Sequence, residues 1–150
     1  MNNILIIGAS GYIGARLSYL LAKDGNNVTA LCFSFVPKDK KWCSLMKDVV
    51  VGDITSDNVI DKITSQSFDV AIHLVSLDHY DSNKAPAFVN SVNVMPVWNL
   101  LESFKTKKTL KRFIYFSTIK LVIFLVLRRG NFLYVGVFVK LFKLKNSLSS

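Results

Sequence analysis

The stretch ILIIGASGYIG, residues 4–14, places three glycines at intervals of three directly after four aliphatic residues. A short apolar run bounded by glycine is typical of a strand that is buried on both faces of a parallel sheet. From Tyr12 the period changes, because apolar residues recur at helical spacing as far as Leu21, and Gly25 stands where a helix C-terminus favours glycine. The stretch therefore predicts a buried strand, a tight turn and a helix.

The rest of residues 1–120 continues this alternation. The pattern predicts further strands at 28–33, 49–51, 70–74 and 112–116, and helices at about 56–65 and 85–105. Pro96 should kink or break the second helix, and residues 37–48 form a polar, basic loop with room for a helical turn. Alternating strands and helices with right-handed crossovers predict an α/β fold. The expected architecture is a Rossmann-like, doubly wound parallel sheet, incomplete, with strand order 3-2-1-4-5.

The glycine turn has the form that binds a pyrophosphate in such a fold. Gly8 allows a tight turn, Gly11 lets the backbone approach the phosphates, and Gly14 lets the helix pack close to the strand. The helix N-terminus adds free N–H groups and a partial positive charge. The alternative is that these are ordinary turn glycines. A buried strand before them and an amphipathic helix after them favour a dinucleotide site.

The spacing Gly-x-x-Gly-x-x-Gly resembles that of the extended short-chain dehydrogenase/reductase family, the NAD-dependent epimerases and dehydratases that act on sugars. Four later segments are similar to family motifs and come in the same order: Gly-Asp-Ile at 52–54, His-Leu-Val-Ser at 73–76, Asn-Ser-Val-Asn-Val at 90–94 and Arg-Phe-Ile-Tyr-Phe-Ser-Thr at 112–118. The resemblance covers about residues 1–120. It implies NAD or NADP as the cofactor and a nucleotide-sugar as the candidate substrate.

The resemblance also implies which residues hold the cofactor. They come from the glycine turn and from the segments after later strands: Gly8, Ser10, Gly11, Tyr12, Ile13, Gly14, Asp53, Ile54, Leu74, Val75, Ser76 and Asn93. In the family the Asp of the 52–54 motif contacts the adenine, and the segment after the fourth strand lies along the cofactor. Two alternatives stay open: Asp53 as a simple loop cap, and Asn93 as a helix-face amide without a ligand. For His73 the resemblance implies a structural role at a strand end rather than that of a general base.

The end of the second strand lacks the residue that usually separates NAD from NADP. An acid about 20 residues after the glycines would bind the ribose 2′-hydroxyl and favour NAD. This chain has Cys-Phe-Ser at 32–34, and Asp39 comes several residues later. The three lysines among residues 38–41 could meet a 2′-phosphate, although a solvated loop explains them as well. The choice between NAD and NADP therefore stays open.

In the resembled family, a Ser or Thr after the fifth strand and a Tyr-x-x-x-Lys pair one helix later carry the hydride-transfer chemistry. By position Thr118 matches the Ser or Thr, and Ser117 stands beside it. Tyr134 fails because Phe138 follows it four residues later. The literal match Tyr80–Lys84 follows the fourth strand, so it lies on the wrong connection and is interpreted as coincidence. With the Tyr/Lys pair and the family's C-terminal substrate lobe missing, the resemblance implies impaired catalysis.

Residues 121–150 differ in composition from the rest of the chain. They hold five basic residues and no acidic residue, whereas residues 1–120 hold 14 basic and 10 acidic residues. The resemblance ends at about Lys120, where the family commonly continues with Val-Tyr-Gly and this chain has Leu-Val-Ile at 121–123. We therefore expect an NAD(P)-binding domain, 1–120, and an atypical basic apolar tail, 121–150, with the hypothesis that the tail is translated out of frame. In that case the sheet would end at the fifth strand with an exposed apolar edge.

Composition and charge argue against several classes of protein. Part of the net charge of +9 lies in the tail, so a nucleic-acid partner is not indicated. Arg128 and Arg129 interrupt the longest apolar run, so no run reaches the roughly 18 uncharged apolar residues that a transmembrane helix needs. No secretory leader is recognisable. Cys32 and Cys43 form no metal-binding pattern and are most simply reduced thiols of a cytoplasmic protein.

The expected function is the NAD(P)-binding portion of a nucleotide-sugar epimerase or dehydratase-like protein. Two alternatives stay open. One is a non-catalytic dinucleotide-binding module that regulates a partner. The other is binding to an anionic membrane surface through residues 121–150, a segment rich in basic and aromatic residues. The sequence does not indicate an oligomeric state.

Overall fold

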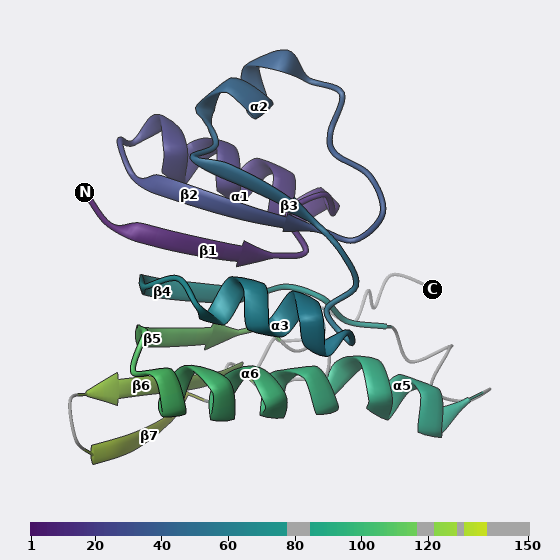
Figure 1. The fold of residues 1–150 in the computed structure, drawn as a ribbon, viewed down its shortest axis with the longest axis vertical. Coiled ribbons are helices and arrows are strands. Elements are labelled where there is room, and N and C mark those ends of the chain that lie inside the picture. The colour runs from purple at the N-terminus through teal and green to yellow at the C-terminus, as the bar shows by residue number, and fades with distance from the viewer. Residues whose placement is uncertain (78–84, 117–121, 129–130, 138–150) are drawn as a thin grey trace, which may run out of the picture.

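The computed structural model describes residues 1–77, 85–116, 122–128 and 131–137, which form one sheet with helices on both faces (Figure 1). The strands are β1 (Asn3–Ile7), β2 (Asn27–Cys32), β3 (Asp48–Val51), β4 (Phe68–His73), β5 (Leu110–Tyr115), β6 (Val122–Arg128) and β7 (Asn131–Val137). The helices are α1 (Tyr12–Lys23), α2 (Lys40–Leu45), α3 (Asp57–Thr64), α5 (Pro86–Asn93) and α6 (Met95–Lys107).

The sheet has the strand order β3-β2-β1-β4-β5-β6-β7. Strands β1 to β5 pair in parallel, which confirms the predicted Rossmann-like order 3-2-1-4-5. The chain runs outward from β1 to β3 and then returns to pair β4 with the other side of β1, where Ile7 lies opposite His73. In such sheets ligands bind at the carboxyl ends of the two strands where the order reverses. A ligand site is therefore expected at the carboxyl ends of β1 and β4.

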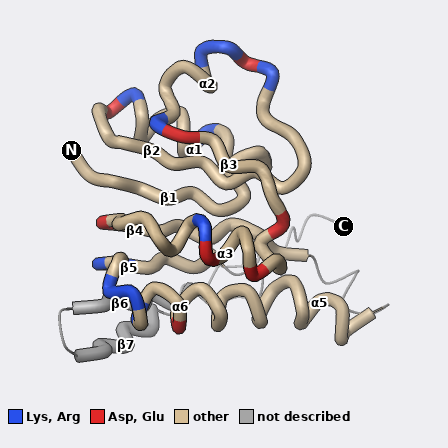
Figure 2. Tube along the Cα trace, in the orientation of Figure 1, with Lys and Arg blue, Asp and Glu red and all other residues tan. Residues whose placement is uncertain are grey.

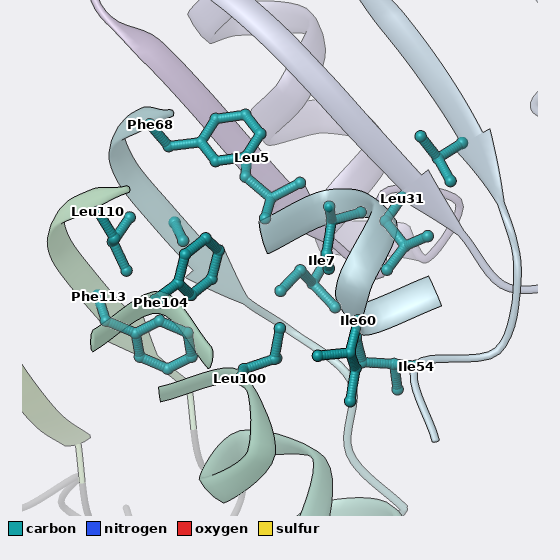
Figure 3. Packing of buried hydrophobic residues seen from close by; sticks show 13 residues of the cluster. Leu5, Ile7, Leu31, Ile54, Ile60, Phe68, Leu100, Phe104, Leu110 and Phe113 are labelled. Carbon is teal, nitrogen blue, oxygen red and sulfur yellow. The ribbon is translucent and has the colours of Figure 1, made fainter. Parts of the chain in front are cut away.

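Alternate residues of β1 face two different cores, because successive side chains of a strand point to opposite faces. Leu5 and Ile7 pack in the core that α3 and α6 cover, and Figure 3 shows this cluster. Ile4 and Ile6 pack in the core on the side of α1 and α2. Both sets are buried, so the uninterrupted aliphatic run that precedes the glycines is the sequence of a strand covered on both faces.

Helix α1 buries small residues rather than its largest ones. Gly14, Ser18 and Ala22 are its buried residues, whereas Ile13 is 59% exposed and Leu20 is 55% exposed. The stripe of small side chains lets the helix axis approach the sheet closely. Helical spacing of apolar residues predicted the helix correctly, but it did not identify the face that packs on the sheet.

The predicted loop at 37–48 contains the short helix α2, which packs against α1. The Asp39 carboxylate caps α2, accepting N–H groups of Lys41 at 2.8 Å and Trp42 at 3.4 Å. The buried Trp42 donates its indole N–H to the hydroxyl of Ser18 at 2.9 Å and to the carbonyl of Ala15 at 3.0 Å. A polar loop is therefore fixed to α1 by one aromatic side chain.

The helix expected at 85–105 is divided at Val94, as Pro96 predicted. Helix α5 ends at Asn93 and α6 begins at Met95. Proline lacks an N–H and its ring excludes the carbonyl four residues earlier, so a continuous helix through this position is disfavoured. The break places Asn93 at the C-terminal end of α5, where its side chain reaches the segment after β4.

The edge of β5 is not open. Strand β6 pairs with it in antiparallel register, with Tyr115 opposite Ile123, and β7 pairs with β6. The expectation of an exposed edge beside β5 is therefore wrong at the level of the backbone. The described segments of the tail continue the sheet as an antiparallel pair, whereas the strands before them are parallel.

Candidate functional site

The glycine turn lies across the carboxyl ends of β1 and β2. The backbone N–H groups of Gly8 and Ala9 both donate to the carbonyl of Leu31, at 3.0 and 2.9 Å. Gly8 has φ of +88°, a conformation that side chains with a Cβ rarely adopt. A Cβ on Gly8 would also lie 3.2 Å from Cγ2 of Val75. The turn thus needs glycine here both for its backbone angle and for contact with the segment after β4.

The other two glycines of the motif, Gly14 and Gly11, differ in how much space surrounds them. A Cβ on Gly14 would lie 2.1 Å from the carbonyl oxygen of Gly8, so glycine is required for α1 to sit against the turn. A Cβ on Gly11 would meet one atom within 4 Å, the same Gly8 oxygen at 3.3 Å. An added Cβ at position 11 would therefore press on one backbone oxygen, and no other atom of the described residues lies within 4 Å of it.

The N-terminus of α1 is free of a side-chain cap. Gly11 is its N-cap residue and has no side chain to accept the first N–H groups of the helix. Tyr12, the first helical residue, is 78% exposed, and the guanidinium carbon of Arg16 lies 4.8 Å from the centre of its ring. Uncapped N–H groups and the helix dipole at such a terminus favour an anion. Ser10 lies in the turn and is half-buried, whereas Ile13 lies in the first turn of α1 and is exposed.

The segment after β4 is held at the glycine turn by Asn93. Leu74 donates its N–H to the carbonyl of Ile7 at 2.9 Å, which carries the segment along the end of β1. The side-chain amide of Asn93 accepts the N–H of Leu77 at 2.7 Å and donates to the carbonyl of Leu77 at 3.0 Å. Leu74, Val75 and Ser76 lie between these two anchors, all half-buried, next to the turn.

Both polar atoms of the Asn93 amide are thus engaged with backbone. This favours the interpretation of Asn93 as a residue that positions the segment, rather than one that contacts the cofactor through its amide. The Tyr115 hydroxyl donates to the carbonyl of Asn93 at 3.2 Å, so β5 supports the same corner.

Asp53 and Ile54 follow β3 at the same edge of the sheet. The Asp53 carboxylate accepts the N–H of Thr55 at 2.9 Å, and the side chain is exposed. This hydrogen bond is the one expected if Asp53 caps the loop after β3. Ile54 is buried in the core with Ile60 (Figure 3), so its side chain contributes to packing.

His73, at the end of β4, is fully buried. Its ring centre lies 5.5 Å from that of Tyr115 and 6.3 Å from that of Phe113, and neither ring nitrogen has a hydrogen-bond partner among the described residues. Burial lowers the pKa of His73 to about 4, so the ring is neutral at pH 7. This environment agrees with the structural role that the resemblance implied for His73.

The predicted catalytic residues Ser117 and Thr118 lie outside the described residues, and so does the Tyr80–Lys84 match. Strand β5, which leads to Ser117, is described as far as Tyr115. Within the described ranges no helix combines the length and apolar character required to cross a membrane.

Residues 4–122 match the model of the NAD dependent epimerase/dehydratase family. The chain belongs to this family. A curated relative, dTDP-D-glucose 4,6-dehydratase of Dictyostelium discoideum, is 28% identical over 131 residues, a match that covers 79% of this chain and 29% of that protein. Residues 123–150, which are the tail without its first two residues, lie outside the family match.

Solved structures of epimerases have the same fold. An epimerase of the methanogen Methanothermobacter thermautotrophicus superposes with a TM-score of 0.61 at 25% identity, over 76% of this chain and 34% of that one. A UDP-glucose-4-epimerase of Stenotrophomonas maltophila, whose structure contains NAD and formylated UDP-arabinopyranose, gives a TM-score of 0.63 at 20% identity, over 79% and 38%. The chain thus spans about a third of the length of the epimerases and dehydratases that it matches.

Arg16 on α1 and Trp42 on α2 were not singled out from the sequence, although the structure shows specific contacts of both. Arg16 lies one helical turn after Tyr12, and a basic residue four positions after an aromatic one on a helix was the available signal. Trp42 was assigned to a polar loop, although a tryptophan in such a loop indicates burial of an aromatic ring.

Proposed function

We propose that the chain binds NAD or NADP with the diphosphate at the glycine turn and the N-terminus of α1. The observation that carries the proposal is Gly11, where a Cβ would meet a single atom and no side chain caps the helix. A dinucleotide diphosphate needs that combination of free N–H groups and close backbone approach. The family, whose description names NAD, supports the same ligand.

The chain's own residues would have distinct roles toward the cofactor. The backbone of Gly8 to Gly14 would bind the diphosphate, and the segment Leu74 to Ser76 would lie along the cofactor, held in place by Asn93. Asp53 and Ile54 stand at the end of β3, two strands from the turn, where an adenosine group would extend. When bound, the nicotinamide would supply the acceptor or donor of a hydride.

The proposed substrate class is a nucleotide-sugar, and catalysis by the chain as given is impaired. The named relatives act on sugar nucleotides, which supports the substrate class. Residues 116–150 contain no Tyr-x-x-x-Lys pair, so this segment lacks the acid/base that the family resemblance implies. Thr118 and Ser117 would be what remains of the catalytic set.

Calorimetric titration of the purified chain with NAD⁺ and NADP⁺ tests cofactor binding. We expect binding of at least one of the two, and loss of it in Gly11→Ala, since φ of −72° at Gly11 is accessible to alanine while the added methyl group occupies the approach path. Lys23→Ala, an exposed change at the other end of α1, is the matched control. Failure of the folded wild-type chain, verified by circular dichroism, to bind either dinucleotide would contradict the proposal.

Turnover is measured separately. The chain is incubated with NAD⁺ and a set of UDP- and dTDP-sugars, and the sugar protons are followed by NMR. We expect no epimerisation or dehydration. Conversion of any sugar at a rate above that of the Gly11→Ala variant would overturn the proposed impairment.

We further propose that residues 1–120 are the dinucleotide-binding domain and that residues 121–150 are read out of frame. The change in composition after Lys120 and the end of the family match at residue 122 support this division. The other two reading frames downstream of codon 120 provide the test. The idea fails if neither encodes Val-Tyr-Gly followed by Tyr-x-x-x-Lys.

The proposed location is the cytoplasm. Cys32 and Cys43 are both free thiols, which supports a reducing compartment. Localisation of a tagged chain by cell fractionation would test this, and recovery in a secreted or membrane fraction would contradict it.

A further inference from the structure

The backbone carbonyl of Asn93 lies at the break between two helices. Helix α5 ends at Asn93 and α6 begins at Met95, so this carbonyl belongs to the last turn of α5. The last carbonyls of a helix need partners from outside it. The hydroxyl of Tyr115 supplies one, because it donates to the Asn93 carbonyl oxygen at 3.2 Å. A side chain of β5 thus reaches a backbone acceptor that the helix break leaves available.

Packing fixes the ring of Tyr115 for this contact. Tyr115 pairs with His73 of the neighbouring parallel strand, and the centres of the two rings are 5.5 Å apart. The side chain is half-buried, and burial raises the pKa of its hydroxyl. The hydroxyl therefore stays protonated at neutral pH and remains a hydrogen-bond donor.

Asn93 connects this contact to the segment after β4. Its carbonyl accepts from Tyr115, while its side-chain amide pairs with the N–H and the carbonyl of Leu77 at 2.7 and 3.0 Å. At the other end of the segment, Leu74 donates to the carbonyl of Ile7 at 2.9 Å. Because Asn93 is bound through both its backbone and its side chain, a shift of its backbone also moves the amide that holds Leu77.

The ends of β4, β5 and α5 meet at a corner without charge. Among the described residues 70–77, 85–101 and 113–116 there is no Lys, Arg, Asp or Glu, and Figure 2 shows α5 free of charged residues. Salt screens pairs of charges, whereas the hydrogen bonds of Tyr115 and Asn93 join neutral groups. The contacts at this corner should therefore hold at any ionic strength.

The corner lies on the opposite side of β1 from β3. The sheet order places β4 and β5 on one side of β1, and β2 and β3 on the other. A dinucleotide bound across such a sheet has one mononucleotide half on each side of the point where the strand order reverses. With the adenosine half at the end of β3, the nicotinamide half would extend toward the ends of β4 and β5.

Resting on the proposed dinucleotide binding, we infer that Tyr115 is a positioning residue for the nicotinamide half of the cofactor. Its hydroxyl fixes the backbone of Asn93, and the Asn93 amide fixes the segment after β4 at Leu77. The hydroxyl is engaged with Asn93, so its effect on binding passes through that residue rather than through contact with the cofactor.

Calorimetric titration of the full chain with NAD⁺, NADP⁺ and ADP tests the inference. ADP carries the adenosine and the diphosphate without the nicotinamide. Tyr115→Phe keeps the ring and removes the hydroxyl, so we expect the preferred dinucleotide to bind about 3- to 10-fold more weakly, with ADP within about twofold. Tyr19→Phe, which changes a half-buried tyrosine of α1, is the matched control and should alter neither affinity.

A double-mutant cycle with Asn93→Ala separates this indirect effect from a direct one. Asn93→Ala removes the amide that holds Leu77 but retains the backbone carbonyl that Tyr115 binds. In that background Tyr115→Phe should leave the dinucleotide affinity within about twofold, because the connection to Leu77 is already lost. An equal loss from Tyr115→Phe in both backgrounds overturns the action of Tyr115 through Asn93.

Amide hydrogen exchange of the cofactor-free chain tests the same connection without a ligand. The Leu77 N–H, which Asn93 accepts, should exchange faster in Tyr115→Phe than in the wild-type chain. The N–H of Ile60, which donates within the first turn of α3, reports general destabilisation and should be unchanged. Exchange of Leu77 that does not change, or that rises only as much as that of Ile60, overturns the inference.

The titrations distinguish failure of this inference from failure of the proposed function. Dinucleotide binding that Tyr115→Phe leaves intact, or that it weakens as much as ADP binding, overturns the positioning role while the proposed function stands. Absence of binding of either dinucleotide to the folded wild-type chain overturns both together.

Discussion

The side-chain amide of Asn93 pairs with the backbone of Leu77 on both sides, accepting its N–H at 2.7 Å and donating to its carbonyl at 3.0 Å. The two residues are separated by 16 positions and belong to the end of α5 and the segment after β4. One side chain thus replaces the hydrogen bonds that a neighbouring strand would supply. It fixes the segment that faces the glycine turn.

Asn93→Asp should destabilise the fold by about 1–3 kcal/mol, because it removes the donor and places a carboxylate beside the carbonyl of Leu77. Urea denaturation followed by circular dichroism measures the change. Asn90→Asp, an exposed substitution on the same helix, is the matched control and should have little effect. Equal losses in the two variants would show that the Leu77 contact contributes nothing specific.

The two glycines at the start of α1 should respond differently to the same substitution. Gly14→Ala introduces a Cβ 2.1 Å from a backbone oxygen that cannot move away cheaply, so we expect a loss of about 1–3 kcal/mol or more in unfolding free energy. Gly11→Ala should change stability by no more than about 1 kcal/mol, since its φ is allowed and one contact at 3.3 Å must adjust.

Urea denaturation of both variants, together with dinucleotide titration, separates packing from binding. Gly11→Ala should lose binding with its stability retained. A Gly11→Ala protein as unstable as Gly14→Ala would mean that position 11 is glycine for structural reasons.

Much of the fold could be predicted because the deciding signals are local. An aliphatic run, a glycine turn and the spacing of strands and helices predicted the order of β1 to β5, and Pro96 predicted the division between α5 and α6. Each of these rests on backbone chemistry that acts over a few residues: φ above zero, a missing N–H, or side chains on alternate faces.

The rest depends on contacts between distant residues. Nothing adjacent to Asn93 specifies that its partner is the backbone of Leu77, and nothing adjacent to Trp42 specifies Ser18 as an acceptor. Helix α1 buries its small residues because Gly8 and Gly14 approach so closely, a constraint that hydrophobic spacing does not report. The pairing of β6 with β5 was likewise absent from the composition of the tail, which indicated only its unusual character.

Trp42→Phe should cost about 1 kcal/mol per hydrogen bond lost while the aromatic ring stays buried. The indole N–H serves two acceptors on α1, and Ser18 retains its own bond to the carbonyl of Gly14 at 2.7 Å. Thermal denaturation measures the difference, and Trp98→Phe on the exposed face of α6 is the control. A Trp42→Phe protein with the wild-type midpoint would show that the ring alone, without its N–H, fixes α2.

The burial of His73 gives stability a defined pH dependence. Its pKa is about 4 in the folded chain and near the ordinary value of 6.5 once unfolded, so between these pH values the unfolded state binds a proton that the folded state does not. Stability should therefore be independent of this group above about pH 6.5 and fall as the pH drops toward 4. The full loss is about 3 kcal/mol, since each unit of difference in pKa corresponds to about 1.4 kcal/mol.

Urea denaturation at pH 7.5, 6, 5 and 4.5 measures this slope, and His73→Phe should remove it because phenylalanine can pack between Phe113 and Tyr115 without titrating. Asp69 does not contribute to the change in stability between pH 6.5 and 4.5. Its hydrogen bond with Lys111 lowers the pKa of its carboxyl from 3.8, so its contribution is lost below that pH. A slope between pH 6.5 and 4.5 that persists unchanged in His73→Phe would refute the assignment and place the responsible titration in another group.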